Sequence, residues 1–199
     1  MLWILIDQRA VLPREWHRTF AGTPVEAVTS DIVQAAQGSA WVSPANSFGW
    51  MDGGLDWTIR QAYDRAGCDI TALVQAAIRD QAGGELPVGQ ALIVPTPNTP
   101  YTHLIVAPTM RTPRPAFWTL NAYLAFRAIL LTVRLWHARH PEDPMAAVYC
   151  PGLATGVGKM PPGRCARQMR AAWDQVMTPP DALPSLGTLT AQELRWRHG

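Results

Sequence analysis

The chain has 199 residues, of which 48% are hydrophobic and 16% charged, a composition typical of a globular domain with its own core. Its formal net charge at pH 7 is only +2, and it contains no long run of Lys or Arg. This balance argues against double-stranded nucleic acid as the main partner. Cys68, Cys150 and Cys165 lack the spacing of a metal site and are typical of reduced thiols. We expect a cytoplasmic protein with no cofactor and no metal.

Two apolar stretches are long enough to ask whether each is a buried core segment or a membrane-directed segment. The first segment, MLWILID, has no basic leader and soon reaches Asp7, so we expect a buried strand over residues 1–6 and not a signal peptide. The longest apolar tract, LNAYLAFRAILLTV, contains Arg127 and is shorter than the ~20 residues that a membrane helix needs. Neither stretch predicts attachment to a membrane.

The first half of the chain alternates predicted strands and helices. Apolar side chains at helical spacing run from Ile70 to Ile78, and the glycine pair at 83–84 is a helix-ending signal. In chain order we expect a loop or short helix over 8–18, a strand over 25–32 that ends in Asp31, a short helix over 32–37, a strand over 40–43, a helical zone that starts at Asp56 and a second helix over 68–80.

The second half continues the same alternation. Residues 91–95 and 103–107 are continuous apolar runs separated by a proline-rich turn, as buried strands are. A helix over 117–138, a strand over 146–150 and a helix over 164–177 follow. Interleaved strands and helices indicate an α/β sandwich with a largely parallel sheet. We expect one domain over residues 1–178 and a tail over 179–199 with a short helix near 191–197.

Glycine-containing loops follow two of the predicted strands. VSPANSFGWMDGGLD (42–56) passes from a strand through Asn46 and a glycine pair to Asp56 at the start of a helix, and ATGVG (154–158) follows the last strand. Glycines let the backbone approach a ligand closely, and a helix N-terminus presents unpaired N–H groups. Ligands of parallel sheets gather at the carboxyl ends of the strands. The two loops together predict a site for a phosphate-bearing ligand.

In order and spacing, these segments resemble the macrodomain family, whose members bind ADP-ribose. The family motif VNAANSxLxGGGGVDG is similar to VSPANSFGWMDGGLDW, with Asn46 and Asp56 at the family interval. Three further family signatures, GDI, CPTGEAxIT and STGxxG, resemble SDI at 30–32, LPVGQALIV at 86–94 and ATGVG at 154–158. The likeness covers about residues 25–177, and the pair Asn46 and Asp56 places it nearest the MacroD-like hydrolase branch.

The resemblance implies a three-layer α/β/α sandwich with a six-stranded mixed sheet. It also implies that Asp31 accepts a hydrogen bond from the adenine amino group and that Asn46 and Asp56 face the distal ribose as catalytic residues. Members with both residues often hydrolyse ADP-ribosyl esters on acidic side chains and O-acetyl-ADP-ribose. The other ligand-binding residues that the resemblance implies are Ile32, next to Asp31 in sequence, then Gly53, Gly54 and Leu55 on one side of the diphosphate, and Thr155, Gly156, Val157 and Gly158 on the other.

The function expected from this resemblance is removal of ADP-ribose from modified protein, nucleic acid or O-acetyl-ADP-ribose by a monomer. Two alternatives stay open, a reader module that binds ADP-ribose without turnover and an ADP-ribose 1''-phosphate phosphatase. Alone, Asn46 and Asp56 are equally typical of a turn residue and a helix cap. No second carboxylate is evident near Asp56 in the sequence, so we expect Asp56 to organise water without a carboxylate partner.

Several positions depart from the family pattern. Ser43 stands where the family often has another asparagine, and residues 50–52 (WMD) replace glycines or small residues with a bulkier and more acidic loop. Lys159 and Met160 occupy a region where the family usually has an aromatic residue. Ser43 predicts a lost or shifted contact to the distal ribose. Two interpretations of Lys159 stay open, neutralisation of phosphate or a site tuned to an altered substrate.

Overall fold

The computed structural model describes residues 1–198 and contains one six-stranded sheet. The strands are β1 (Leu2–Asp7), β2 (Val25–Thr29), β3 (Ala40–Ser43), β4 (Leu92–Pro95), β5 (His103–Val106) and β6 (Ala147–Cys150). Their order across the sheet is β2-β1-β6-β3-β5-β4, and every neighbouring pair is parallel except β4 and β5, which are antiparallel. The predicted six-stranded mixed sheet is therefore confirmed.

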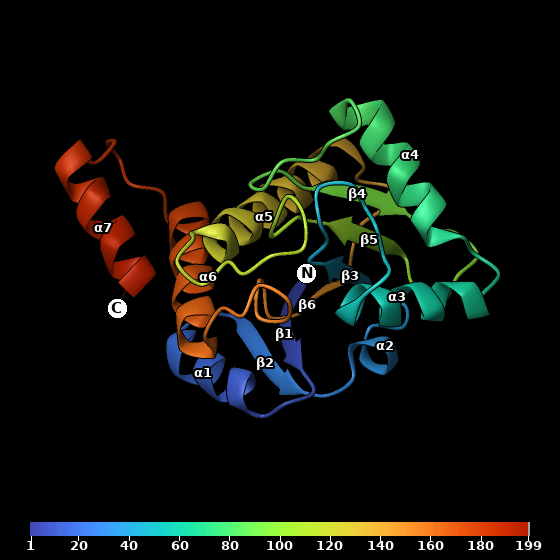
Figure 1. Ribbon diagram of the computed structural model, residues 1–199, viewed down its shortest axis with the longest axis horizontal. Helices are drawn as coiled ribbons and strands as arrows, with labels where there is room; N and C mark the ends of the chain where they lie inside the picture. The colour runs from blue at the N-terminus through green and yellow to red at the C-terminus, as the bar shows by residue number, and fades with distance from the viewer. Residues whose placement is uncertain (199) are drawn as a thin grey trace.

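Helices cover both faces of this sheet, which gives the predicted three layers (Figure 1). The helices are α1 (Val11–Thr19), α2 (Ile32–Ala35), α3 (Gly54–Arg65), α4 (Ile70–Ala82), α5 (Asn121–Arg139), α6 (Pro162–Met177) and α7 (Leu186–His198). Helices α1, α5 and α6 pack on one face, whereas α2, α3 and α4 pack on the other. Within residues 1–198, no helix has the length and apolar character needed to cross a membrane.

Two hydrophobic cores lie on the two faces of the sheet. Successive side chains of a strand point to opposite faces, so β3 contributes Val42 to the core under α1, α5 and α6 and Trp41 to the core under α2, α3 and α4. Trp41 is fully buried, stacks on Tyr101 with 4.1 Å between ring centroids and donates its indole N–H to the Tyr63 hydroxyl at 2.9 Å. These contacts fix α3, which carries Asp56, against β3.

The parallel arrangement brings several strand ends to one edge of the sheet. The N-terminal strand β1 lies inside the sheet, between β2 and β6, and ends at Asp7. Strands β2, β3 and β6 run in the same direction, so the segments that follow them leave from the same edge. This edge receives both glycine-containing loops and also the segment after β1.

Element boundaries differ from the sequence expectations where local hydrogen bonds decide them. Strand β2 stops at Thr29, because the Asp31 carboxylate accepts the Val33 N–H at 2.8 Å and begins α2. Helix α3 begins at Gly54, two residues before the predicted start. Helix α5 begins at Asn121 and not at 117, since Thr119 folds back in a turn onto the Ala116 carbonyl at 3.2 Å.

The C-terminal helix α7 spans Leu186–His198 and is longer than the predicted 191–197. It lies beside α6, with the Trp196 ring stacked on Tyr123 of α5 at 4.7 Å between centroids and its carbonyl accepting the Gln168 side-chain amide at 3.1 Å (Figure 1). Gly199, the end of the predicted tail, lies outside the described residues. The division between residues 178 and 179 stays a prediction.

Candidate functional site

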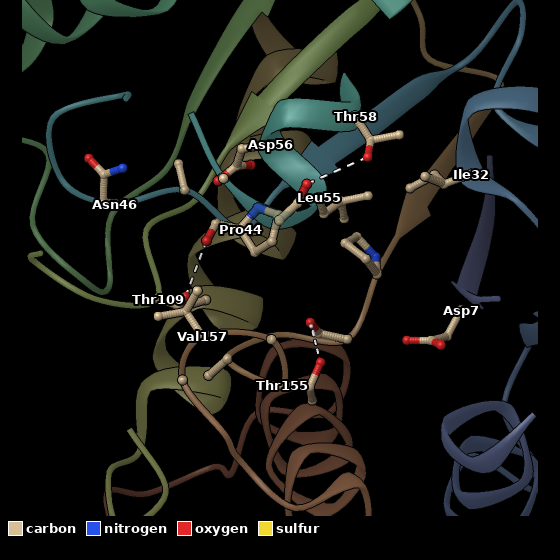
Figure 2. A pocket seen from close by; sticks show the side chains of 18 of the residues that line it. Asp7, Ile32, Pro44, Asn46, Leu55, Asp56, Thr58, Thr109, Thr155 and Val157 are labelled. Atoms are coloured by element: carbon tan, nitrogen blue, oxygen red, sulfur yellow. Dashed lines mark hydrogen bonds between the residues drawn. The ribbon is translucent and has the colours of Figure 1, made fainter. Parts of the chain in front are cut away.

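A cavity of about 390 Å³ lies at the carboxyl edge of the parallel strands. Its walls come from the segments that follow β1, β2, β3, β5 and β6, and both glycine-containing loops belong to them. Figure 2 shows Leu55 and Asp56 on one side of this space and Thr155 and Val157 on the other. The structure therefore places the two loops on facing walls of one pocket.

The loop after β3 is organised by Asn46, whose side chain is buried. Its Nδ2 donates to the Trp50 carbonyl at 2.8 Å, and its Oδ1 accepts the N–H groups of Phe48 at 3.1 Å and Trp50 at 3.4 Å. Gly49 in this turn has φ +69°, and a Cβ there would lie 2.6 Å from the Val74 side chain. Asn46 thus acts as the turn residue of the loop, and Trp50, 58% exposed, lies on the pocket wall.

The glycine pair before α3 leaves the backbone open toward the cavity. Gly54 has φ +58°, a conformation that favours glycine, and a Cβ on Gly53 or Gly54 would meet no atom within 4 Å. The N–H groups of the first helical turn, from Gly54 to Asp56, have no acceptor within the helix and form the positive end of its dipole. This end of α3 is suited to an anion.

The loop after β6 also leaves backbone N–H groups open toward the cavity, and it forms a tighter turn. The Met160 N–H donates to the Ala154 carbonyl at 2.9 Å and the Lys159 N–H to the Gly156 carbonyl at 3.1 Å. A Cβ on Gly158 would lie 2.4 Å from the Ala154 carbonyl oxygen, so this position requires glycine. Among residues 1–198, no acceptor takes the N–H groups of positions 155–158, which leaves them available to a ligand.

Asp56 occupies the first turn of α3 and is half-buried on the pocket wall. The Ser43 hydroxyl donates to its Oδ1 at 2.6 Å. Burial raises the pKa of Asp56 from 3.8 to about 6, with the Ser43 hydrogen bond opposing the rise and the negative charge of Asp52 adding to it. A carboxylate with a pKa near 6 is ionised at neutral pH and is also a useful base.

Asp52 corrects one sequence-based expectation. From the sequence we expect no second carboxylate near Asp56, yet Asp52 lines the same cavity and is close enough to raise the pKa of Asp56. The sequence signal was present, since Asp52 stands only four residues before Asp56 in the acidic loop at 50–52. No group of three or more metal-ligating side chains occurs within residues 1–198.

The opposite end of the cavity includes residues that the sequence did not single out. Asp7, the last residue of β1, and Arg9, in the segment after it, line it together with Ile32. Asp7 Oδ1 accepts the Arg9 backbone N–H at 2.8 Å and its side-chain Nε at 3.3 Å. Figure 2 shows Asp7 and Ile32 on the side of the cavity away from Asn46. Asp7 is the last residue of β1, at the carboxyl edge of the sheet, and no local sequence pattern marks this position as part of the site.

Asp31 is placed differently from its predicted neighbours in the site. Its carboxylate caps α2, and it is not one of the residues that line the cavity, although Ser30 and Ile32 are. The other predicted site residues line the cavity: Asn46, Gly53, Gly54, Leu55, Asp56, Thr155, Gly156, Val157 and Gly158. Lys159 does not line it. The roles of all these residues toward a ligand stay predictions.

An α/β/α domain with two facing backbone loops at the carboxyl edge of its sheet belongs to the class that binds anionic ligands through main-chain donors. The family model described as Macro domain matches residues 42–169. This match spans more than half of the chain, so the chain belongs to the Macro domain family and the predicted family is confirmed. The matched region begins within β3 and ends within α6, and it leaves β1, α1, β2, α2 and α7 outside it.

Individual proteins show the same likeness. An uncharacterized protein of Aeropyrum pernix is 29% identical over 151 residues, which cover 76% of this chain and 71% of that protein. The Oceanobacillus iheyensis macrodomain solved with ADP gives a TM-score of 0.58 at 20% identity, covering 84% of this chain and 87% of its own. The macrodomain of Mycobacterium tuberculosis DarG gives 0.57 at 19% identity, covering 75% and 89%. These structures show the shared fold.

Proposed function

We propose that this protein binds ADP-ribose in the cavity and hydrolyses the bond between its distal ribose and an acceptor group. The observation that carries the proposal is Asp56, half-buried between two backbone loops, held by Ser43 and carrying a pKa raised to about 6. Membership of the Macro domain family supports the choice of ligand. A structural neighbour, Thermosipho africanus DarTG, is solved in complex with ADP-ribose; it gives a TM-score of 0.50 at 14% identity over 73% of this chain and 38% of that one.

The diphosphate of ADP-ribose is proposed to lie between the two loops. Its negative charge would be met by the N–H groups at the start of α3 on one side and by those of positions 155–158 on the other. Backbone donors at a helix N-terminus bind phosphate without a basic side chain. The charged side chains on the described cavity wall are Asp7, Arg9, Asp52 and Asp56, so side chains alone would repel an anion.

For substrates joined through the anomeric carbon, the proposed reaction is attack by water on that carbon of the distal ribose. The ionised carboxylate of Asp56 takes the proton from that water, because its pKa lies close to neutral pH. The bond from the anomeric carbon to the acceptor breaks, and its electron pair leaves with the acceptor, which takes up a proton from solvent. The substrate's own diphosphate would stabilise the positive charge that develops on the ribose. For O-acetyl-ADP-ribose, water attacks the acetyl carbonyl carbon instead, acetate is released, and the ribose oxygen takes up a proton.

One observation favours the reader module as a second candidate. The Asn46 side chain, expected to contact the distal ribose, is occupied with the backbone of Phe48 and Trp50. If it serves only this turn, the site has one catalytic side chain fewer than the proposed hydrolysis expects. Binding without turnover then becomes the function to compare.

The test combines calorimetry with turnover assays on wild-type protein and Asp56→Ala. We expect ADP-ribose to bind both proteins with similar affinity, whereas only the wild type releases ADP-ribose from a substrate. Suitable substrates are an ADP-ribosyl glutamate ester, an ADP-ribosylated oligonucleotide and O-acetyl-ADP-ribose, with ADP-ribose 1''-phosphate added to detect phosphatase activity. Asp80→Ala on the outer surface of α4 is the matched control, because Asp80 is 68% exposed and does not line the cavity.

The outcomes separate the candidates. Binding without turnover of any substrate would replace the hydrolase by the reader module. Full activity of Asp56→Ala would remove Asp56 from the mechanism, and absence of ADP-ribose binding would overturn the choice of ligand. The substrate that is cleaved fastest identifies the linkage.

A further inference from the structure

Ser43 is buried and does not line the cavity, but its hydroxyl contacts Asp56, which does. Its side chain is 1% exposed, and its hydroxyl lies 2.6 Å from Asp56 Oδ1. Residue 43 is the last of β3, where it pairs with Val106 of β5 and its carbonyl accepts the Ala107 N–H at 3.0 Å. The hydroxyl is therefore presented from a rigid position inside the sheet.

The hydrogen bond has a direction that matters for Asp56. An ionised carboxylate only accepts hydrogen bonds, so the Ser43 hydroxyl must be the donor. It occupies Oδ1, and within residues 1–198 Oδ2 accepts no hydrogen bond. One carboxylate oxygen is thus anchored to the sheet, and the other is left for a molecule in the cavity that Asp56 lines.

We propose that Ser43 is a positioning residue for the hydrolysis: its hydroxyl anchors one oxygen of Asp56 so that the other takes the proton from water, and it favours the ionised carboxylate. This inference rests on the proposed function. Ser43 does not touch the substrate and acts through Asp56. In the family resemblance this position often holds asparagine, so the anchor is a feature of this chain's own sequence.

Beside the dipole of α3, the Ser43 hydroxyl is the side-chain group that opposes the cost of burying Asp56. Asp52, on the loop before α3, raises the pKa of Asp56, whereas the Ser43 hydrogen bond lowers it. Of the elements packed on α3, α2 and β3 carry no charged side chain, and Arg79 and Asp80 of α4 are exposed and paired with each other at 3.4 Å. Along α3 itself, Arg60 and Asp64 also pair with each other at 3.5 Å.

The experiment measures the ionisation of Asp56 directly in wild type and Ser43→Ala by ¹³C NMR of labelled aspartate, with Asp56→Asn to assign the signal. A hydrogen bond donated to an ionised carboxylate lowers its pKa by about one unit. The midpoint of the Asp56 titration should therefore rise by about one pH unit in Ser43→Ala. The acidic limb of kcat/KM against pH should move by the same amount. At pH 6 this corresponds to about a fivefold loss of kcat/KM.

Ser47→Ala is the matched control. Ser47 is also 1% exposed and lies in the same segment after β3, but its hydroxyl has no hydrogen-bond partner among residues 1–198. Its removal should move neither the Asp56 midpoint nor the pH profile. Ser43→Thr keeps a hydroxyl and should restore the wild-type midpoint. If Ser43→Ala does not fold, Ser43→Cys, whose thiol is a weak donor, supplies the same measurement.

An unchanged midpoint in Ser43→Ala, or an equal rise in Ser47→Ala, overturns the inference. If the wild type binds ADP-ribose but cleaves no substrate, the proposed hydrolysis fails and Ser43 has no reaction to assist. The NMR titration still decides in that case whether Ser43 sets the ionisation of Asp56, so the two failures are distinguishable.

Discussion

Replacement of Asp56 by Asn should stabilise the fold at neutral pH while it removes the proposed base. Asn is close in size to Asp, and its side-chain oxygen can still accept the Ser43 hydroxyl, so the change mainly removes the negative charge. That charge is unfavourable in the folded protein, because burial raises the pKa of Asp56 from 3.8 to about 6. The unfolded chain, in which the carboxylate is hydrated, does not bear this cost.

The magnitude follows from the two pKa values. A rise from 3.8 to about 6 corresponds to about 3 kcal/mol in favour of the unfolded state above pH 6. The dipole of α3 favours a carboxylate in its first turn by about 0.5 kcal/mol, and Asn loses that contribution. Asp56→Asn should therefore raise the free energy of unfolding by about 2 to 3 kcal/mol at pH 7 to 8, or raise Tm by about 4 to 12 °C.

The pH dependence gives the sign of the effect. Between the unfolded pKa of 3.8 and the folded pKa of about 6, the folded protein holds more protons than the unfolded chain, so wild-type stability falls as pH rises through this window. The difference between variant and wild type should be below about 1 kcal/mol near pH 4 and reach its full value above pH 6. Urea unfolding of both proteins from pH 4 to 8 measures it.

Asp80→Asn on α4 is the control, since Asp80 is 68% exposed and should give nearly equal stabilities at every pH. The reasoning is refuted if Asp56→Asn is less stable than the wild type at pH 7.5. It is also refuted if the gain in stability is the same at pH 4 as at pH 7.5, because removal of a titrating charge must depend on pH.

Three further outcomes test the walls of the pocket. Gly158→Ala should weaken ADP-ribose binding at least tenfold by calorimetry, because the new Cβ would lie 2.4 Å from the Ala154 carbonyl oxygen and must displace the loop; unchanged affinity would show that the loop does not hold the ligand. Asn46→Ala should lower the free energy of unfolding by about 1 to 3 kcal/mol in urea and alter the fluorescence of Trp50, since it removes the bonds that hold the turn. Arg9→Ala should weaken ADP-ribose binding a few-fold, because Arg9 is the basic residue among the charged side chains on the described cavity wall, and unchanged affinity would show that Arg9 does not contact the ligand.

That the two glycine-containing loops face each other could be predicted from the sequence. In a parallel sheet, the loops that follow the strands all leave from the same edge. Both loops follow strands that point the same way, so they meet at one edge whatever the details of packing. Asn46 and Asp56 were found for the same reason, since they belong to the loop that follows β3. The order and spacing of the motif residues were therefore enough to predict that these two loops form walls of the cavity.

The other wall of the cavity could not be predicted in this way. Asp7 and Arg9 lie there because β1 inserts between β2 and β6, and a pairing between the start and the end of a chain leaves no local signal. The Ser43 to Asp56 hydrogen bond spans thirteen residues and depends on how α3 packs on β3. Asp31 caps α2 through Oδ1, and its predicted contact with adenine stays a prediction, because a cap and a ligand contact can use different oxygens of one carboxylate.

The proposed recognition through the backbone would explain how this pocket tolerates unusual side chains. A main-chain N–H group is supplied by any residue except proline, so the loops require glycine only where a Cβ would clash or where φ is positive, as at Gly158 and Gly54. Side chains between those positions are free to vary, which is consistent with a shared fold at 19 to 20% identity. The acidic residue Asp52 can then line the pocket without removing its anion donors, and its charge acts instead on Asp56, the group whose ionisation the proposed reaction needs.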